Sequence, residues 1–515
     1  MFARTYSAAV VGVDAVQVAV EADCSGSGMN GLELVGLPDN AVKESRQRIR
    51  SAFENSSMRM TQRTVVVNLA PADLRKEGAA FDLPIAVSVL AVTQQIPSER
   101  LGETMFAGEL SLDGTVKGVK GILPLALCAR SRGLRRVVVP AENAAEAAVV
   151  EGLEVIPVTS IGEVAGYLRG DIAITPAPRP ETVAADAADT RFAEDFADVK
   201  GQARVKRALE IAAAGGHNVI MVGAPGSGKT MLARRLPTIM PPLTSDEALE
   251  TTKIHSVAGK LGAVRGLMTC RPFRAPHHLA SQVALIGGGQ SPQPGEVSLA
   301  HNGILFLDEL PEFGRNVLEV LRQPLEDKRL TVSRAKYSVE YPCNFTLVAA
   351  MNPCPCGYYN HPDKECTCGA GTVQRYMGRI SGPLLDRIDI HIEVTPVPVA
   401  ELDASRGGEE SSAEVRERVV RARRIQRERF GGMAGVHTNA MMNSKMLREF
   451  CRLDAQSRSV LESAMERLQL SARAYDRIVK VARTIADLEG AADIAARHIA
   501  EAIQYRTLDR ENWGR

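Results

Sequence analysis

The sequence predicts an α/β protein that ends in a helical region, and three observations indicate this. The length of 515 residues allows about three domains of about 100–200 residues each. Short apolar runs such as NVIMV, GILFL and FTLVAAM have the length and composition of buried strands, and amphipathic helical patterns lie between them. Residues 397–515 are mostly helical in pattern and include SARAYDRIVKVARTIADL.

The chain divides into four segments by composition and periodicity. Residues 1–170 alternate strand and helix patterns, among them the amphipathic helix AVKESRQRIRSAFENS. Residues 171–191 have neither periodicity and are rich in Pro, Ala and Asp, which is typical of an extended linker. Residues 192–396 form a second α/β block with a cysteine-containing insertion at 354–368, and 397–515 form the helical region.

The composition excludes several classes of protein. Hydrophobic residues make up 45% and charged residues 24%, which is a globular balance and excludes a wholly disordered chain. No apolar run reaches the ~18–20 residues of a membrane helix, and the first residues alternate like a strand pair, so we expect a cytoplasmic protein. Lys plus Arg (62) nearly equals Asp plus Glu (61), so nucleic-acid contacts would have to come from local patches.

A phosphate-binding loop is the strongest motif. In NVIMVGAPGSGKTMLARRL the spacing GxxxxGK[ST] follows an apolar strand and opens a helix, which is the context that the motif requires. Backbone N–H groups of such a loop surround phosphates, the lysine neutralises β/γ charge, and the hydroxyl binds Mg²⁺. The nucleotide-binding residues are therefore expected to be Gly223, Ala224, Pro225, Gly226, Ser227, Gly228, Lys229 and Thr230.

An acidic pair follows the next apolar strand, in GILFLDELPEF. Carboxylates at a strand end are costly unless they serve a cation or polarise water. We expect Asp308 to hold Mg²⁺, together with Thr230, and Glu309 to activate the attacking water. The pair is weak evidence alone and strong evidence beside the phosphate loop.

Two further polar residues, Asn352 and Arg387, each have two alternative roles that fit the sequence. Asn352 ends the strand FTLVAAMNP, where it either positions water near the γ-phosphate or simply forms an Asn-Pro turn. Arg387 in GPLLDRIDI either stabilises phosphoryl-transfer charge in a neighbouring subunit or makes a surface salt bridge with Asp386 or Asp389.

Six strings span nearly the whole chain: GLPDNAVKESRQRIRSA, GAPGSGKTMLARRLP, FRAPHHLASQVALIGGG, GEVSLAHNGILFLDELPEF, AAMNPCPCG and SGPLLDRIDI. Together with the motifs above they resemble the AAA+ superfamily, and in particular its magnesium-chelatase-like branch called YifB or ComM. The resemblance implies Walker A and B roles for the two motifs, sensor 1 at Asn352, an arginine finger at Arg387 and sensor 2 at Arg473, with Arg477 as the alternative. It also implies a hexameric ring that binds ATP between subunits and acts in DNA branch migration during recombination or natural transformation.

The N-terminal block resembles the Lon protease domain without its catalytic pair. Ala80 in RKEGAAFDLPIAVSVLA stands where the resemblance places the nucleophilic serine, and Leu123 stands where it places the lysine. A Ser–Lys pair needs hydroxyl and base within hydrogen-bond reach. We therefore expect a proteolytically inactive module, although Lys117 and Lys120 are close in sequence.

Four cysteines form a CxC-x₉-CxC pattern, namely Cys354, Cys356, Cys366 and Cys368. Four thiolates would surround one Zn²⁺ tetrahedrally. The spacing differs from the commoner CxxC, so a loop of reduced thiols stays open as the alternative. We expect structural zinc that braces the insertion.

The segment RLTVSRAKYSVEYP predicts a β-hairpin with Arg334 and Lys336 near its tip. Cations on a pore-lining hairpin would contact DNA phosphates without reading bases; subunit packing is the alternative.

Two other charged patterns are less specific. The seven arginines between Glu414 and Phe430 favour a solvated helix face, and the DxSxS pattern that starts at Asp23 favours a turn over a metal-adhesion site.

Four functions remain compatible with these patterns to different degrees. A DNA motor with ATP and Mg²⁺ is the favoured one. A magnesium-chelatase motor subunit is opposed by the N-terminal block and the cysteine insertion, and an ATP-dependent protease is opposed by the residues at 80 and 123. A chaperone-like remodeller of a protein partner is compatible with the same motor.

Overall fold

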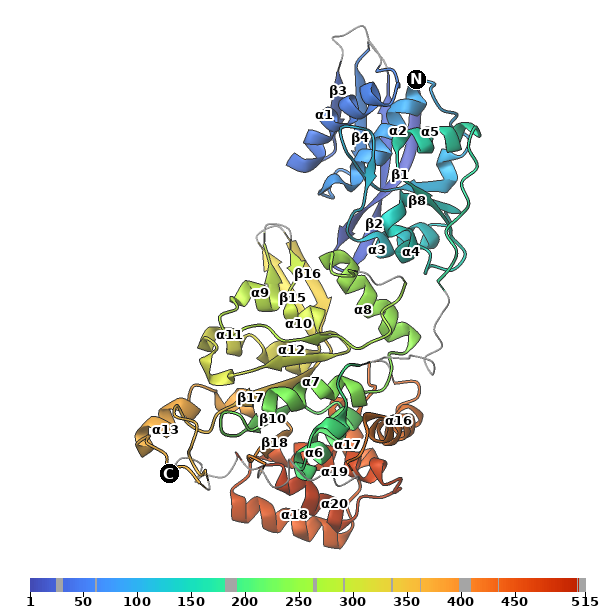
Figure 1. Ribbon diagram of the computed structural model, residues 1–515. Helices are drawn as coiled ribbons and strands as arrows, with labels where there is room; N and C mark the ends of the chain where they lie inside the picture. The colour runs from blue at the N-terminus through green and yellow to red at the C-terminus, as the bar shows by residue number, and fades with distance from the viewer. Residues whose placement is uncertain are drawn as a thin grey trace.

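The computed structural model contains two α/β domains, one above the other in Figure 1, and a helical region below the second. The predicted α/β class, with a parallel sheet and a helical C-terminal region, is confirmed. The structure describes residues 1–24, 31–60, 63–180, 192–262, 266–289, 292–334, 337–361, 363–397, 409–433, 435–506 and 508.

The N-terminal domain is built on a mixed seven-stranded sheet in the order β3-β4-β2-β1-β5-β8-β9. The first two strands form a long antiparallel hairpin, in register from Phe2 opposite Asp23 to Val11 opposite Asp14. The strands are β1 (Phe2–Val11), β2 (Asp14–Asp23), β3 (Leu32–Val35), β4 (Val65–Ala70), β5 (Thr104–Phe106), β8 (Arg136–Pro140) and β9 (Glu154–Val158), with a small ribbon of β6 (Glu109–Leu110) and β7 (Val116–Lys117).

Helices cover both faces of this sheet and give it two apolar cores. The helices are α1 (Asn40–Asn55), α2 (Asp82–Val92) and α5 (Ile161–Arg169) in one core, and α3 (Ile122–Ser131) and α4 (Ala144–Ala147) in the other. Every residue of α2 is buried, including Asp82. The Arg48 guanidinium binds that carboxylate at 2.6 and 2.9 Å, which offsets the cost of burying the charge.

The second domain contains a five-stranded parallel sheet in the order β11-β14-β17-β10-β18. Because all strands run the same way, one edge of the sheet carries every carboxyl end and the other every amino end. The strands are β10 (Val219–Val222), β11 (Phe273–Arg274), β14 (Ile304–Leu307), β17 (Thr346–Met351) and β18 (Ile390–Glu393).

Two core clusters lie on the two faces of the parallel sheet. One cluster joins the sheet to α6 (Ala203–Gly215), α7 (Lys229–Ile239) and the helical region. The other joins it to α9 (Gln282–Ile286), α10 (Glu296–Leu299), α11 (Arg315–Glu319), α12 (Arg322–Asp327), α13 (Ala370–Met377), α14 (Gly382–Leu385) and a hairpin of β15 (Arg329–Arg334) and β16 (Tyr337–Pro342). A short ribbon of β12 (Gly287–Gly288) and β13 (Gln293–Pro294) follows α9.

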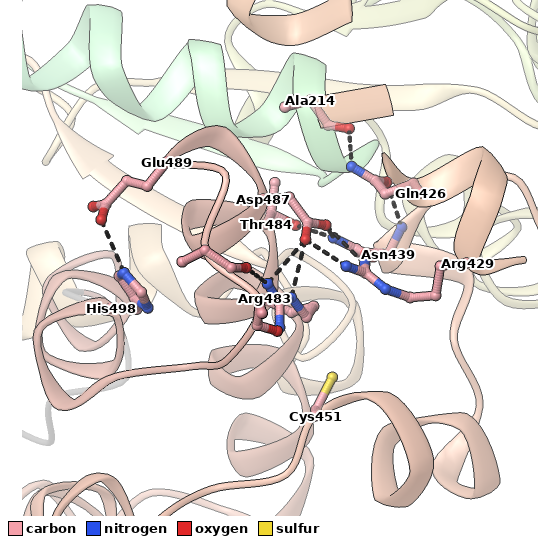
Figure 2. Close-up of polar contacts among 12 residues, drawn as sticks. Ala214, Gln426, Arg429, Asn439, Cys451, Arg483, Thr484, Asp487, Glu489 and His498 are labelled. Atoms are coloured by element: carbon pink, nitrogen blue, oxygen red, sulfur yellow. Dashed lines mark hydrogen bonds and ion pairs between the residues drawn. The ribbon is translucent and has the colours of Figure 1, made fainter. Parts of the chain in front are cut away.

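The helical region is held by a buried polar cluster (Figure 2) as well as by apolar packing. Arg429, Arg483 and Asn439 all donate to the Asp487 carboxylate, at 2.5–3.0 Å. The helices are α16 (Ser412–Arg429), α17 (Ser444–Phe450), α18 (Ala455–Leu468), α19 (Ala472–Leu488) and α20 (Ala496–Gln504). Short 3₁₀ turns are Ala79–Phe81, Leu101–Glu103, Ala141–Asn143, Phe196–Asp198, Leu310–Glu312 and Asn439–Met441.

The arginine-rich helix α16 differs from the solvated face expected of it. Arg421 pairs with Glu417 on the surface. Arg416 and Arg423 instead donate to the carbonyls of Thr238 and Ala213 in the parallel-sheet domain. Several of these arginines therefore fasten the helical region to the domain above it.

The two α/β domains meet at α8 (Ser245–Ala258), which lies against α3. Glu146 is buried there and accepts hydrogen bonds from the Leu123 amide, at 2.8 Å, and from the Ser256 hydroxyl across the junction. The Ser256 carbonyl accepts from the Gly121 amide at 3.2 Å. Burial raises the pKa of Glu146, while its hydrogen bonds with Ser256 and Leu123 act in the opposite direction.

Within the described part of the chain, every helix is either too short or too polar to cross a bilayer.

Candidate active site

The phosphate loop lies at the carboxyl edge of the parallel sheet, between β10 and α7. Gly226 and Gly228 have φ of 79° and 90°, a region that favours glycine. At Gly223 a Cβ would lie 2.3 Å from the Val394 carbonyl oxygen, so a side chain is excluded there. The predicted loop residues Gly223, Ala224, Pro225, Gly226, Ser227, Gly228, Lys229 and Thr230 thus form one continuous turn into the helix.

Lys229 is placed to receive negative charge. Its ammonium donates to the carbonyls of Gly223 and Ala224 at 2.6 and 2.9 Å, and to Asn352 Oδ1 at 3.3 Å. Burial lowers the pKa of Lys229, and the Asp308 charge opposes that shift. An ammonium held by neutral oxygens keeps its full charge for a phosphate.

Thr230 and Asp308 form a pair of oxygen ligands. The Thr230 hydroxyl donates to Asp308 Oδ2 at 2.7 Å, and Asp308 Oδ1 accepts from the Glu309 amide at 3.0 Å. Hydroxyl and carboxylate oxygens are the ligands that Mg²⁺ prefers. The two residues fit the magnesium position predicted from the sequence.

Glu309 follows Asp308 in a strained conformation. Its φ is 52°, which non-glycine residues adopt at a cost of about 1–3 kcal/mol and mostly at functional sites. Its carboxylate lies 3.0 Å from His278 Nδ1. The sequence analysis did not predict a role for His278. The HH pair in FRAPHHLAS could have indicated one, but no sequence pattern connects this pair with Glu309.

The arginines with predicted phosphate roles lie at the other edge of the sheet. Arg387 precedes the amino end of β18, and Arg473, in α19, contacts Asp386 of the same segment. Arg387 pairs with Glu326 and donates to the Pro383 carbonyl at 2.7 Å. Its ion pair is therefore with a partner that the sequence did not suggest. Arg473 lies 3.4 Å from Asp386 and is 65% exposed, whereas Arg477 binds Asp389 at 2.6 Å and is 24% exposed.

The strand length separates these arginines from the phosphate loop of the same chain. β10 and β18 have four residues each and run in parallel, and a strand rises about 3.3 Å per residue. The two edges are thus separated by about 13 Å. Arg387 and Arg473 therefore lie at the edge opposite the phosphate loop of the same chain.

Asp389 organises the amino edge. Its side chain is 1% exposed and binds Arg477 and, at 3.1 Å, His217 Nδ1. Burial opposes the charge, but the Arg477 guanidinium and the His217 hydrogen bond hold the pKa of Asp389 well below its usual range. A cavity of about 1260 Å³ adjoins this cluster and is also lined by Lys328 and Lys480. Burial and the Arg477 charge lower the pKa of Lys480 to about 8.

The four cysteines converge in the insertion after β17. Sγ–Sγ distances are 3.3 Å for Cys354–Cys356, 3.7 Å for Cys354–Cys366 and 3.5 Å for Cys356–Cys366. All four thiols, including that of Cys368, lie within 4.8 Å of one another. Zn–S bonds of about 2.3 Å give a tetrahedron with edges of about 3.8 Å, so the thiols fit one zinc ion.

The predicted hairpin is confirmed, and its two strands are β15 and β16. The register runs from Arg329 opposite Pro342 to Arg334 opposite Tyr337. Arg334 is the last residue of β15, and Lys336 lies outside the described residues. Of the two cations that we predicted to contact DNA, Arg334 thus lies at the carboxyl end of β15.

The positions of the N-terminal block that we compared with a protease hold no nucleophile or base. Ala80 lies in the 3₁₀ turn before α2, and Leu123 is fully buried in α3. Asp23 of the DxSxS pattern ends β2 and lies 3.4 Å from the chain's terminal amine. Ser25 and Ser27 lie outside the described residues.

Comparison with known proteins agrees with this architecture. Three family models match successive parts of the chain: "Subunit ChlI of Mg-chelatase" at 20–143, "Magnesium chelatase, subunit ChlI" at 195–402 and "Magnesium chelatase, subunit ChlI C-terminal" at 409–506. Competence protein ComM of Haemophilus influenzae is 44% identical over 509 residues, covering 99% of this chain and 98% of the relative. The chain belongs to the YifB/ComM family of magnesium-chelatase-like AAA+ proteins.

Other relatives show where this YifB/ComM-type chain stands in the wider group. YifB of Escherichia coli is 42% identical over 505 residues, 98% of this chain and 97% of the relative. The chloroplastic magnesium-chelatase subunit ChlI of rice is 26% identical over 268 residues, 46% of this chain and 59% of that one. Membership of the AAA+ family implies an ATPase that uses ATP with Mg²⁺.

Proposed function

We propose that this YifB/ComM-type chain is the subunit of a hexameric motor that hydrolyses ATP to move DNA. The activity would be of the helicase or branch-migration kind, in recombination or natural transformation. A relative that matches almost end to end is named a competence protein, which supports a role close to DNA.

The position of the β15–β16 hairpin is the observation that carries the proposal. The hairpin is inserted between β14, which is followed by Asp308 and Glu309, and β17, which leads to Asn352. Both strands are fully buried in the sheet. The chain therefore joins the hairpin on one side to the segment that follows Glu309 and on the other side to the strand that precedes Asn352.

The side chains at the carboxyl edge divide the chemistry of hydrolysis among them. ATP with Mg²⁺ would supply the scissile anhydride and a cation that neutralises its charge. Lys229 holds the β/γ-phosphate charge, and Thr230 and Asp308 provide oxygen ligands. Glu309 takes a proton from the attacking water, and the Asn352 amide orients that water.

The arginines of the amino edge complete the site of a neighbouring copy. Arg387 and Arg473 belong to the surface that is separated from the chain's own phosphate loop. In a closed ring the amino edge of one subunit would face the carboxyl edge of the next. Hydrolysis would then require assembly, because each subunit holds only one half of the charge stabilisation.

The proposed cofactors are ATP and Mg²⁺ at the carboxyl edge and Zn²⁺ on the four cysteines. Zinc at a site with four protein thiolates has no open position and is structural. It would brace the insertion that follows Asn352.

ATPase rates with and without single-stranded, duplex and four-way-junction DNA test the motor. We expect DNA to raise the rate, and binding to weaken steeply with salt because neutralised phosphates release counterions. Arg334→Ala combined with Lys336→Ala should lower DNA affinity and the stimulated rate. Arg329→Ala is the matched control, since it removes a cation of the same hairpin that Glu340 already neutralises at 2.6 Å.

Two outcomes would reject the proposal. If the parent neither binds DNA at low salt nor hydrolyses ATP faster with it, a chaperone-like or chelatase-like remodeller of a protein partner replaces the DNA motor. If the double variant and Arg329→Ala weaken DNA binding equally, the hairpin tip is not the DNA contact.

A further inference from the structure

The cysteine insertion touches the phosphate loop directly. The strand that leads into it places the Met351 carbonyl 3.2 Å from the Gly223 amide. One residue later, Asn352 Oδ1 accepts from the Lys229 ammonium at 3.3 Å. The insertion is thus joined to both ends of the loop before its first cysteine.

A third contact lies between the cysteines. Gly357 has φ of 85°, and a Cβ on it would lie 2.4 Å from Pro225 Cδ. The glycine backbone therefore packs against the middle of the phosphate loop. Cys354 and Cys356 directly precede this contact in the chain, and the Gly357 amide donates to the Cys354 carbonyl at 3.0 Å.

The histidine of the insertion, His361, forms hydrogen bonds within its own loop. His361 Nδ1 accepts from the amides of Asp363 and Lys364 at 3.0 and 3.1 Å, and Lys364 lies over the Tyr358 ring at 4.8 Å. These contacts shape the turn between the cysteine pairs. Among the described residues, the group of side chains that could hold a metal ion consists of the four thiols.

We propose that zinc on Cys354, Cys356, Cys366 and Cys368 holds the phosphate loop and Asn352 in their nucleotide-binding geometry. Three of the thiols are partly exposed, so packing alone gives them little reason to stay within bonding distance of one metal. Losing the metal releases the turn at Gly357 and with it the support of Pro225. Nucleotide affinity, and not only folding, then depends on the metal.

The inference rests on the ATPase part of the proposed function and not on the DNA part. The experiment is therefore done without DNA, on the full-length chain. Elemental analysis gives the zinc content, and isothermal titration with MgADP gives the nucleotide affinity. Zinc is displaced with a mercurial and captured by a chelator, and excess thiol then strips the mercurial from the cysteines. After buffer exchange Mg²⁺ is restored, and Zn²⁺ is added back.

We expect about one zinc per chain. Removal should lower MgADP affinity by roughly ten- to a hundredfold, the scale of a binding group displaced by about 1 Å, and added Zn²⁺ should restore it. Cys366→Ser should lose zinc and affinity together. Cys270→Ser is the matched control because this cysteine is exposed and outside the cluster.

A second variant separates the contact from the metal. Gly357→Ala keeps all four thiols but pushes on Pro225, so it should retain zinc and still lose affinity. Gly369→Ala, at a glycine with open space around it, should change neither. Absence of zinc, or unchanged MgADP affinity after its removal, overturns the inference. If these zinc and affinity results hold but DNA does not raise the ATPase rate in the separate assay of the proposed function, only the DNA motor is rejected.

Discussion

The two edges of the parallel sheet differ in how their charges are satisfied. At the carboxyl edge the Lys229 ammonium contacts carbonyl and amide oxygens, so its positive charge is available to an anion. At the amino edge Arg387 and Arg473 have carboxylate partners in Glu326 and Asp386. The first edge is prepared for a ligand, whereas the second is neutralised within the chain.

If the chain forms the proposed ring, this difference makes an isolated chain only half of a site in two respects. Its own nucleotide would be bound but would lack the arginines, and its arginines would be engaged by carboxylates. In the proposed ring, assembly would exchange these intramolecular ion pairs for contacts with a neighbour's phosphate. Because exposed ion pairs are worth about 0–1 kcal/mol, that exchange is inexpensive for Arg473.

The largest effect that separates the edges is expected at Lys229. Lys229→Ala removes the cation that faces the β/γ-phosphates, so MgATP binding should be lost in a titration. Arg234→Ala is the control, since this arginine is exposed on the same helix. Equal affinity of Lys229→Ala and the parent would mean that the carboxyl edge is not the nucleotide site.

Glu309→Gln should keep binding and lose turnover. The amide preserves the shape but cannot take a proton, so hydrolysis should fall by roughly 10²–10⁴-fold. Affinity for MgATP and phosphate release are measured on the same preparation. Hydrolysis at the parent rate would contradict the role of Glu309 as the base.

Asp389→Asn tests how much the buried ion pair with Arg477 at the amino edge contributes to the free energy of unfolding. Removing a charge that is buried against Arg477 leaves that guanidinium unpaired, which costs about 3–5 kcal/mol of unfolding free energy. The control Asp386→Asn removes the 3.4 Å contact of an exposed arginine and should cost less than about 1 kcal/mol. Thermal unfolding followed by circular dichroism compares them at pH 7.

The same comparison has a defined pH dependence. The pKa of Asp389 is lower in the folded than in the unfolded chain, so its contribution is complete above the unfolded pKa of about 3.9. It is lost as pH falls toward the folded pKa. The difference between parent and Asp389→Asn should therefore shrink below about pH 4, and a constant difference would contradict the ion pair.

The smallest signal is expected from mixed assemblies. Rings of Arg387→Ala alone, or of Lys229→Ala alone, should be inactive for different reasons. Mixed rings contain some interfaces with an intact carboxyl edge and an intact arginine, so a small fraction of activity should return. Zero recovery in rings shown to be mixed would place the function of Arg387 within its own chain.

The sequence predicted residues whose partners are set by local structure. Gly228, Lys229 and Thr230 follow a strand and open a helix, so their positions depend on one turn of chain. The acidic pair and Asn352 follow neighbouring parallel strands, which brings them to the same edge. For these residues the motif already determines the geometry.

The partners that the sequence did not predict are distant in the chain. His278 meets Glu309, Glu326 meets Arg387, and Ser256 meets Glu146. Each pair depends on how whole elements pack, and none has a periodic or motif signal. The side of the sheet on which Arg473 lies was likewise fixed by the packing of α19.

The junction between α3 and α8 has a practical consequence for dissecting the chain. Glu146 is buried against Ser256, and the β1–β2 turn at Gly12 packs against Val339 of the hairpin. A protease that cut between the two domains would leave fragments that stay associated and elute together. An N-terminal fragment expressed alone would present an uncovered carboxylate and an apolar helix face to water, so it would be a poor surrogate for the domain in the intact protein.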